Sequence, residues 1–405
     1  MKKSTKKTLS LLALIGLSSP IFAGEKEDAI INKAVNAYGG KSFLSLKGIS
    51  VEDKYKGFRY GQSRSPTEPD IQHNHYTINL DIENKRKEFQ WIRGEGDDFS
   101  TQHQLFDGKQ GYRIDHTTKT MYEQNSITFI NAARRHLFLL DSAILQVMNG
   151  ARETVEFLGE EIHQGELHNK LSFKDQNTPE MTVYLNAETG LISTMTRKHW
   201  QDGLFRYHYS NVKTIDHIKF AHNTYVTRGG KPFEVVTDRK IIVNPSFTKD
   251  FILPEGYEEE AKTLNFPEML VKQLSKNVYL AGKGWGFSIF YDAGNYYVAS
   301  GGYKDLTTRF NEVKKFTGKD KPLKYQIVTH HHLDHLGGMN EAEQLGAIFV
   351  TAKSHAETIK SMVDKPLADN RFIFVDSTGS IANNMVNAID FPSGHASNHL
   401  SVYFK

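Results

Sequence analysis

The densest group of metal-binding side chains in this 405-residue sequence lies in the stretch THHHLDHLGG, residues 329–338. It places four histidines and one aspartate between His330 and His335. Neutral imidazole is the commonest nitrogen ligand of zinc, and carboxylate oxygen is also a common zinc ligand. The chain has no cysteine, so a zinc ion would have to be held by histidine and carboxylate side chains. The stretch therefore predicts a metal site.

The spacing within the stretch separates its histidines into two sets. The apolar segment KYQIVT runs directly into the cluster and is predicted to be a strand. If the extended conformation continues, His330 and His332 point to one side and His331 to the other, because side chains alternate along a strand. Two imidazoles on one side can bind one ion. The alternative, a solvated run of histidines, is disfavoured by the apolar strand that precedes it.

A third ligand for this ion is expected from the stretch DFPSGHASNH near the end of the chain. Catalytic zinc takes three protein ligands and a water, so the pair needs a further histidine. His395 follows a predicted strand and a Ser-Gly turn, and Gly394 lets the backbone come close to the ion. Asp334 and His335 turn with the loop after His332 and can offer an oxygen and a nitrogen to a second ion.

These two stretches resemble the metallo-β-lactamase superfamily of hydrolases. HHHLDH contains the His-x-His-x-Asp-His motif, and SGHASNHLSVYF is similar to that family's later Gly-His step into a strand. The resemblance covers about residues 270–405. It implies two metal sites, for zinc or alternatively iron or manganese: His330, His332 and His395 in the first, Asp334 and His335 in the second. It also implies a metal-bound hydroxide, oriented by Asp334 as the catalytic residue, acting on an ester, lactone, thioester or amide.

Two features depart from the family pattern. Ser300 stands at the end of the predicted strand YYVASGG, where members often carry an acidic residue. The family's second half normally supplies a bridging aspartate and a last histidine, whereas this chain stops at Lys405. We therefore expect the second metal to have two protein ligands. The chain is expected to be a fragment, a prematurely terminated product, or a degenerate member completed by a partner.

Other histidines near these motifs are predicted to be structural. His331 is expected to pack or to face solvent, and His355 to lie on the surface at the start of a helix. His399 is expected to be structural, with substrate contact as the alternative. The HNH stretch at 73–75 shares the His-x-His spacing, but no third ligand is in view, so no metal is expected there.

Residues 24–260 are predicted to form an antiparallel β-rich domain, because strand-forming segments alternate with Gly, Asn and Asp turns. Two helices are expected, over residues 26–40 and 126–150. Around VEFLGEEIHQGELHNKLSF the pattern resembles the periplasmic lipoprotein-carrier fold, in which a curved sheet wraps a helix. The resemblance implies contact with lipid or lipoprotein. The favoured alternative is a packing or substrate-capping role.

The segment 244–269, with three prolines and an acidic run, is the predicted domain boundary. Beyond it, alternating strands and helices predict an incomplete αββα domain of the metallo-β-lactamase type over residues 270–405, which makes the chain α+β. The first helix of this domain is predicted to have its cap at Asp305, its stop at Gly318 and its buried face at Phe310, Val313 and Phe316.

The first 23 residues have the shape of a cleaved secretory signal, with four lysines, a short apolar run and a small residue before Gly24. This predicts a periplasmic or secreted protein without a transmembrane segment. Without those four lysines the formal net charge of +3 becomes −1, which gives no support for a nucleic-acid or anionic-membrane partner. A zinc-dependent hydrolase of a small molecule is the first hypothesis. The alternative is a non-catalytic binding protein with a vestigial or partner-completed metal domain.

Overall fold

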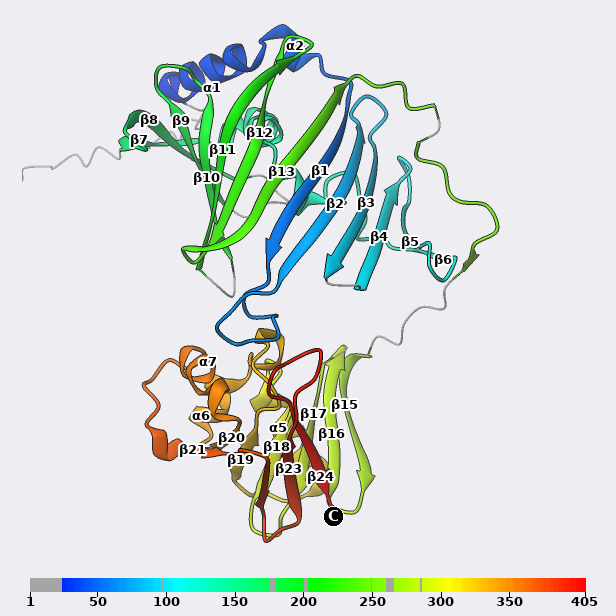
Figure 1. The fold of residues 1–405 in the computed structure, drawn as a ribbon, viewed down its shortest axis with the longest axis vertical. Coiled ribbons are helices and arrows are strands. Elements are labelled where there is room, and N and C mark those ends of the chain that lie inside the picture. The colour runs from blue at the N-terminus through cyan, green and yellow to red at the C-terminus, as the bar shows by residue number, and fades with distance from the viewer. Residues whose placement is uncertain are drawn as a thin grey trace, which may run out of the picture.

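The computed structural model describes residues 24–95, 98–174, 180–199, 203–248, 250–259, 266–284 and 286–405. The predicted secretory signal lies outside these residues. The described chain is rich in strands and forms an N-terminal part (residues 24–259) and a C-terminal part (residues 266–405), seen above and below one another in Figure 1.

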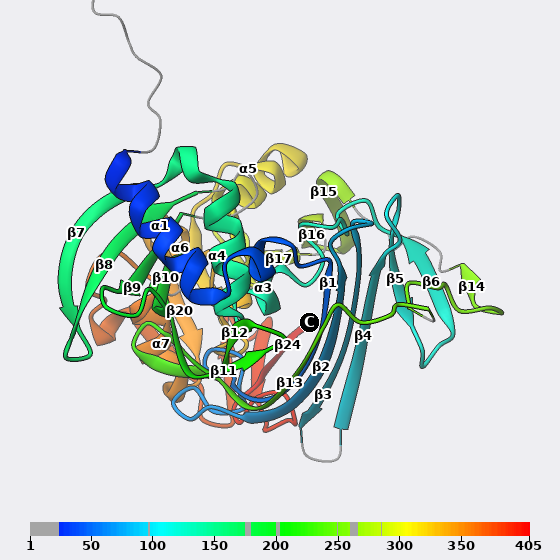
Figure 2. The ribbon, with the colours of Figure 1, turned by 90° about the horizontal axis from the view of Figure 1, so that it is seen from above.

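The N-terminal part contains one fourteen-stranded sheet. It is antiparallel apart from one parallel pair at its edge, formed by the two strands that come first in the spatial order below. In spatial order its strands are β14 (Glu258–Glu259), β6 (Thr120–Glu123), β5 (Gly111–Asp115), β4 (Asp98–Phe106), β3 (Arg86–Glu95), β2 (Ile71–Asp81), β1 (Gly48–Phe58), β13 (Lys231–Val243), β12 (Ile218–Arg228), β11 (Gly203–Ile215), β10 (Ile192–His199), β9 (Met181–Asn186), β8 (Glu166–Phe173) and β7 (Glu156–His163). Figure 2 shows this sheet curving around the helices.

The helices of the N-terminal part are α1 (Glu25–Tyr38), α2 (Lys41–Leu44), α3 (Arg134–Leu137) and α4 (Asp141–Gly150), with a 3₁₀ turn η1 (Arg152–Thr154). Acidic residues in the first turn of α1 suit the positive end of the helix, and its apolar residues recur at helical spacing. The helix ends at Gly39, whose φ of 128° few other residues adopt, and α1 contacts α4 and β12 in the main core.

The single long helix predicted over residues 126–150 is wrong, because the chain breaks between α3 and α4. Two carbonyl oxygens in this break accept hydrogen bonds from side chains of the sheet. The Tyr209 hydroxyl donates to Phe138 at 2.6 Å, and the Thr224 hydroxyl donates to Leu139 at 2.8 Å. Leu140 is extended, with φ −107° and ψ 114°. Contacts with the sheet therefore override the local helical pattern.

The C-terminal part contains two sheets. The seven-stranded sheet consists, in spatial order, of β15 (Phe266–Ser275), β16 (Val278–Gly284), β17 (Gly286–Asp292), β18 (Tyr297–Ser300), β19 (Leu323–Ile327), β20 (Ile348–Thr351) and β21 (Phe372–Phe374). The three-stranded sheet consists of β22 (Thr378–Ile381), β23 (Val386–Asp390) and β24 (Leu400–Phe404). Its helices are α5 (Leu306–Thr317), α6 (Met339–Gln344) and α7 (Ala356–Ser361), with 3₁₀ turns η2 (Leu333–His335), η3 (Lys353–His355) and η4 (Asp369–Arg371).

These elements form three layers. Tyr297 and Ala299 of β18 belong to the core beneath the helices, whereas Val298 between them belongs to the core shared with the three-stranded sheet. Such alternation is expected for a strand buried on both faces. The order of layers is helices, seven-stranded sheet, three-stranded sheet.

Asp305 is at the predicted N-cap position of α5, but its expected capping hydrogen bond and the expected burial of Phe316 are both wrong. Asp305 precedes the helix in a left-handed conformation and its side chain does not cap it. The Glu341 carboxylate instead accepts a hydrogen bond from the Thr307 N–H at 2.6 Å. Phe316 is 54% exposed, because the buried face of the helix is set by Leu306, Phe310 and Val313. The predicted stop at Gly318 is confirmed by its φ of 67°.

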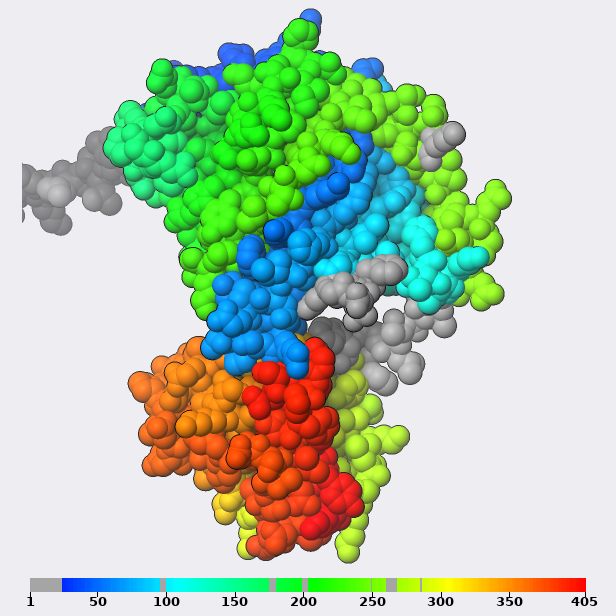
Figure 3. Space-filling view, in the orientation of Figure 1, coloured from blue at the N-terminus to red at the C-terminus, as the bar shows by residue number. Residues whose placement is uncertain are grey.

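The connection between β1 and β2, residues 59–70 and hereafter the β1–β2 loop, reaches from the N-terminal part onto the C-terminal part (Figures 1 and 3). Its Gly61 carbonyl accepts a hydrogen bond from the Leu333 N–H at 3.1 Å, and its Arg64 carbonyl accepts one from the Ser397 N–H at 2.8 Å. The loop therefore touches both segments that carry the predicted metal ligands.

Candidate metal centre

The two histidine stretches meet in space. His330 and His332 follow β19, and His395 lies in the loop between β23 and β24. The Leu400 N–H donates to the Thr329 carbonyl at 2.8 Å, which fixes the second stretch beside the first. One nitrogen from each of the three histidines lies within 4.8 Å of the other two. The geometry therefore brings together the three residues predicted to hold the first metal.

Hydrogen bonds orient two of these imidazoles. Nε2 of His332 lies 3.0 Å from the Ser63 carbonyl oxygen in the β1–β2 loop. A carbonyl only accepts, so Nε2 carries the proton and Nδ1 keeps a lone pair for a metal. Nδ1 of His330 lies 2.9 Å from the Thr329 hydroxyl, and its Nε2 lies 3.1 Å from Nε2 of His395. Metal-binding histidines commonly have this kind of support on their other nitrogen.

Burial keeps His330 and His332 neutral. It lowers the pKa of His330 to about 2, with the neighbouring His335, His332 and His395 rings lowering it further. Burial likewise lowers the pKa of His332 to about 4, although the Ser63 carbonyl acts in the opposite direction. A neutral imidazole presents a lone pair, so the site is prepared for a cation at neutral pH.

Asp334 and His335 border the three histidines. Oδ1 of Asp334 accepts a hydrogen bond of 2.7 Å from the Gln62 side-chain amide, and Oδ2 lies 3.7 Å from Nε2 of His335. The His335 ring centre is 4.4 Å from that of His330. The five predicted residues therefore lie in one cluster, although the group with metal-binding distances among the described residues consists of the three histidines.

His331 is buried, and its Nε2 donates to the same Ser63 carbonyl at 2.9 Å. Packing was one of its two predicted outcomes. His331 packs against the β1–β2 loop, which also supports the proposed metal ligands. The predicted surface position of His355 is wrong. His355 is fully buried, with Nδ1 3.1 Å from the Thr351 hydroxyl, because the 3₁₀ turn before α7 folds back over the end of β20.

The remaining histidines of interest lie as follows. Nδ1 of His399 is 3.3 Å from the Ser393 hydroxyl, and its ring centre is 4.9 Å from that of His330, at the edge of the cluster. Nε2 of His75 lies 3.1 Å from the Glu52 carboxylate. Within the described ranges, the HNH stretch does not belong to any group of three possible metal ligands.

Sequence reasoning missed Gln62 and Ser63. The loop stretch RYGQSRSPTEPD carries turn-forming residues and signals a connection, but nothing in it points to a motif more than 260 residues later.

Solved structures similar to this chain are of two kinds. A LolA superfamily protein from Nitrosomonas europaea matches over 57% of this chain and 100% of its own, at 13% identity and a TM-score of 0.34. A DUF1329 family protein from Desulfovibrio piger matches over 56% and 94%, at 12% identity and a TM-score of 0.32. The metallo-β-lactamase FIM-1 from Pseudomonas aeruginosa, in its mono-zinc form, matches over 35% and 66%, at 18% identity and a TM-score of 0.29.

Structures of both kinds predicted from the sequence are thus among those similar to the chain. The chain spans just under two thirds of the length of FIM-1. Neither a protein-family model nor a curated protein sequence matches it. In the part of the chain that the structure describes, the helices lack the combination of length and apolar character that a membrane span requires.

Proposed function

We propose that this protein is an exported zinc-dependent hydrolase of an ester, lactone, thioester or amide. His330, His332 and His395 hold the metal. The observation that supports this most is the convergence of three imidazole nitrogens within 4.8 Å from segments more than 60 residues apart in the sequence. Burial lowers the pKa of His330 and His332 and keeps these two rings neutral, which fits a divalent cation that prefers nitrogen ligands.

When bound, zinc polarises a substrate oxygen and makes a bound water more acidic. The residues of the chain do the rest. Ser63 holds the tautomer of His332, and the Gln62 amide holds Oδ1 of Asp334. Oδ2 of Asp334 then orients the attacking water and accepts its proton. Asp334 is therefore the catalytic residue of this proposal, and Gln62 is a positioning residue.

Asp334 and His335 are also the proposed protein ligands of a second metal. Their closest side-chain atoms are 3.7 Å apart, and His335 adjoins the first site. Iron or manganese in place of zinc fits the same nitrogen and oxygen ligands. Metal analysis of protein reconstituted with each ion measures both identity and stoichiometry.

The test compares the unaltered protein with two histidine variants. We expect His332→Ala to lose bound zinc and the hydrolysis of p-nitrophenyl acetate, a model lactone or nitrocefin. His73→Ala removes an exposed histidine of β2 and serves as the matched control, so it retains both properties. Protein that holds neither zinc, iron nor manganese after reconstitution contradicts the proposal.

A second candidate is a binding protein in which the N-terminal part, as a domain of its own over residues 24–260, takes a lipid or lipoprotein. The observation in its favour is a cavity of about 600 Å³ on the concave side of the sheet. A biological activity that survives His332→Ala favours this candidate over the hydrolase.

A further inference from the structure

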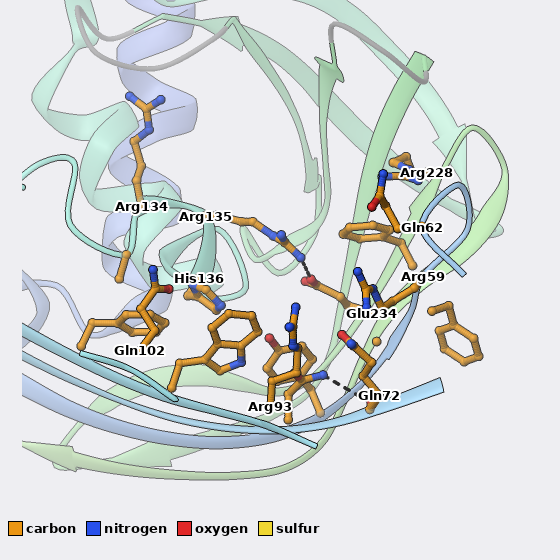
Figure 4. Close-up of a pocket in the computed structure, with 18 of the residues that line it drawn as sticks. Arg59, Gln62, Gln72, Arg93, Gln102, Arg134, Arg135, His136, Arg228 and Glu234 are labelled. Carbon is orange, nitrogen blue, oxygen red and sulfur yellow. Dashed lines mark hydrogen bonds and ion pairs between the residues drawn. The ribbon is translucent and has the colours of Figure 1, made fainter. Parts of the chain in front are cut away.

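The cavity of the N-terminal part is built from β1 to β4, the β1–β2 loop, α3 and the hairpin of β12 and β13 (Figure 4). Its volume of about 600 Å³ lies in the range of small-molecule sites. No sequence motif points to this cavity. Its lining combines a group of arginines, a set of aromatic rings and several side-chain amides.

The arginines give the cavity a positive lining. Five arginines line it against a single carboxylate, that of Glu234. Arg135 forms an ion pair with Glu234, and Figure 4 shows Arg59 and Arg93 close to this pair, whereas Arg134 points away from it. The lining side chains therefore carry more positive than negative charge whatever their internal pairing. Guanidinium groups bind carboxylate, phosphate and sulfonate groups through two parallel N–H donors.

Aromatic rings form a further part of the wall. Phe89 and Trp91 of β3 lie on the concave side, and Phe233 of β13 packs with the arginines, its ring centre 5.0 Å from the Arg135 guanidinium carbon. Such rings offer flat apolar contact to the body of a ligand. A small inorganic anion would leave this surface uncovered.

A buried polar atom also points to a ligand. His136 lines the cavity at 9% exposure, and its Nε2 has no hydrogen-bond partner among the described residues. Its ring centre lies 4.5 Å from that of Phe89 and 4.9 Å from that of Tyr76. Buried polar atoms are nearly always satisfied by protein, water or ligand. His136 thus adds a polar contact within the aromatic wall.

We infer that this cavity binds an anionic amphiphile, a carboxylate, phosphate or sulfonate joined to an apolar body. The anionic group contacts Arg59 and Arg93, and the apolar body lies on the aromatic wall. Binding itself does not depend on the metal centre.

Gln62 places this ligand beside the metal centre. Its side chain lines the cavity and also donates to Oδ1 of Asp334 at 2.7 Å. The role of this ligand rests on the proposed hydrolase function. The ligand is then the substrate or the product, and the scissile bond of the substrate lies on the Gln62 side of the cavity.

The experiment uses two fluorescent probes that differ by one charge. 8-Anilino-1-naphthalenesulfonate carries a sulfonate, and N-phenyl-1-naphthylamine has the same ring systems without it. We expect the unaltered protein to bind the sulfonate probe about tenfold more tightly. Dodecanoate displaces it, whereas inorganic phosphate at the same concentration does not.

The variants locate the charge. The double variant Arg59→Gln/Arg93→Gln is expected to bind the sulfonate probe about tenfold more weakly. Its affinity for the neutral probe should not change, which would show that the cavity remains intact. The control variant Arg206→Gln should change neither probe affinity. Arg206 alternates with the inward-facing Phe205 and Tyr207 of β11 and does not line the cavity. The single Arg93→Gln variant, with a smaller effect in the same direction, replaces the double variant if that does not fold.

Equal affinity for both probes, an unchanged sulfonate affinity in the arginine variants, or equal displacement by inorganic phosphate overturns the inference. The titrations are repeated on His332→Ala after chelator treatment, where binding is expected to persist. Unaltered protein that holds no zinc, iron or manganese after reconstitution but still binds the sulfonate probe more tightly than the neutral probe contradicts only the hydrolase. Unaltered protein that holds zinc and hydrolyses the model substrates but binds both probes with equal affinity contradicts only the anionic amphiphile.

Discussion

The main-chain carbonyl of Ser63 lies 3.0 Å from Nε2 of His332, and this contact joins the β1–β2 loop of one sheet to the histidine motif of another. The same oxygen accepts from Nε2 of His331 at 2.9 Å. The N-terminal part therefore supports the proposed metal ligands directly. A change in its loop should alter the metal centre without touching any ligand residue.

Gln62 tests this dependence through a side chain. Gln62→Ala removes the donor to Oδ1 of Asp334, and we expect about 10–100-fold weaker metal affinity or activity, as is usual when support of a metal ligand is lost. Zinc affinity is measured by competition with a chelator, and kcat separately. Gln90→Ala breaks a comparable amide–carboxylate contact, with Glu88, away from the site and is the control. Equal zinc affinity and equal kcat in both variants would show that Gln62 has no positioning role.

Gly61 tests the same loop through its backbone. A Cβ at Gly61 would lie 2.5 Å from Cδ1 of Leu333, so Gly61→Ala must shift either the Leu333 side chain of η2 or the loop itself. Gly165 has a similar positive φ, but a Cβ there would meet nothing within 4 Å. Both substitutions carry the left-handed penalty of about 1–2 kcal/mol. We expect only Gly61→Ala to weaken zinc binding as well. Zinc titration and urea unfolding of both variants separate the two effects, and identical zinc affinities contradict the prediction.

Lys87 predicts a pH dependence of stability. It is 1% exposed, its Nζ donates to the Ala132 carbonyl at 2.9 Å, and burial lowers its pKa to about 7, with Arg134 lowering it further. Between that value and the usual 10.5, the unfolded chain holds a proton that the folded chain has released. The free energy of unfolding therefore rises with pH, by about 2 kcal/mol between pH 7 and 9.

Urea unfolding at pH 7, 8 and 9 measures this rise as the difference in the free energy of unfolding between the unaltered protein and Lys87→Met. The difference should increase with pH in favour of the unaltered protein. Lys109→Met, at an exposed lysine, should show a difference that does not change with pH. A pH-independent difference for Lys87→Met as well would mean that this lysine titrates normally.

The sequence predicted those parts of the centre whose determinants are local. The spacing from His330 to His335 and the turn before His395 are local patterns, and the structure brings these residues into one cluster. The contacts of Gln62 and Ser63 depend instead on how two sheets are placed, which short sequence patterns do not encode. The cavity escaped prediction for the same reason, because its arginines come from separate strands and loops.

Errors in the helices have a similar cause. The apolar spacing between Ile127 and Met148 favours a helix, but hydrogen bonds from Tyr209 and Thr224 take the carbonyls that would continue it. Burial of His355 likewise follows from the fold back over β20 and not from its polar sequence neighbours. Local patterns gave the type of most elements, and contacts between distant residues decided where those elements break.

The curved sheet contains a buried ion pair between Asp53 and Arg239. We expect the free energy of unfolding to fall sharply when one of the two charges is removed. Both side chains are fully buried, and the carboxylate accepts two hydrogen bonds of 2.7 Å from the guanidinium as well as one from the Tyr76 hydroxyl. Asp53→Ala leaves the Arg239 charge without its carboxylate, and we expect a loss of about 3–5 kcal/mol in the free energy of unfolding. Asp53→Ala/Arg239→Met removes both charges and should recover much of that loss. Urea unfolding at pH 7 measures both variants. A double variant no more stable than Asp53→Ala would show that packing around the pair, and not the uncompensated charge, carries the cost.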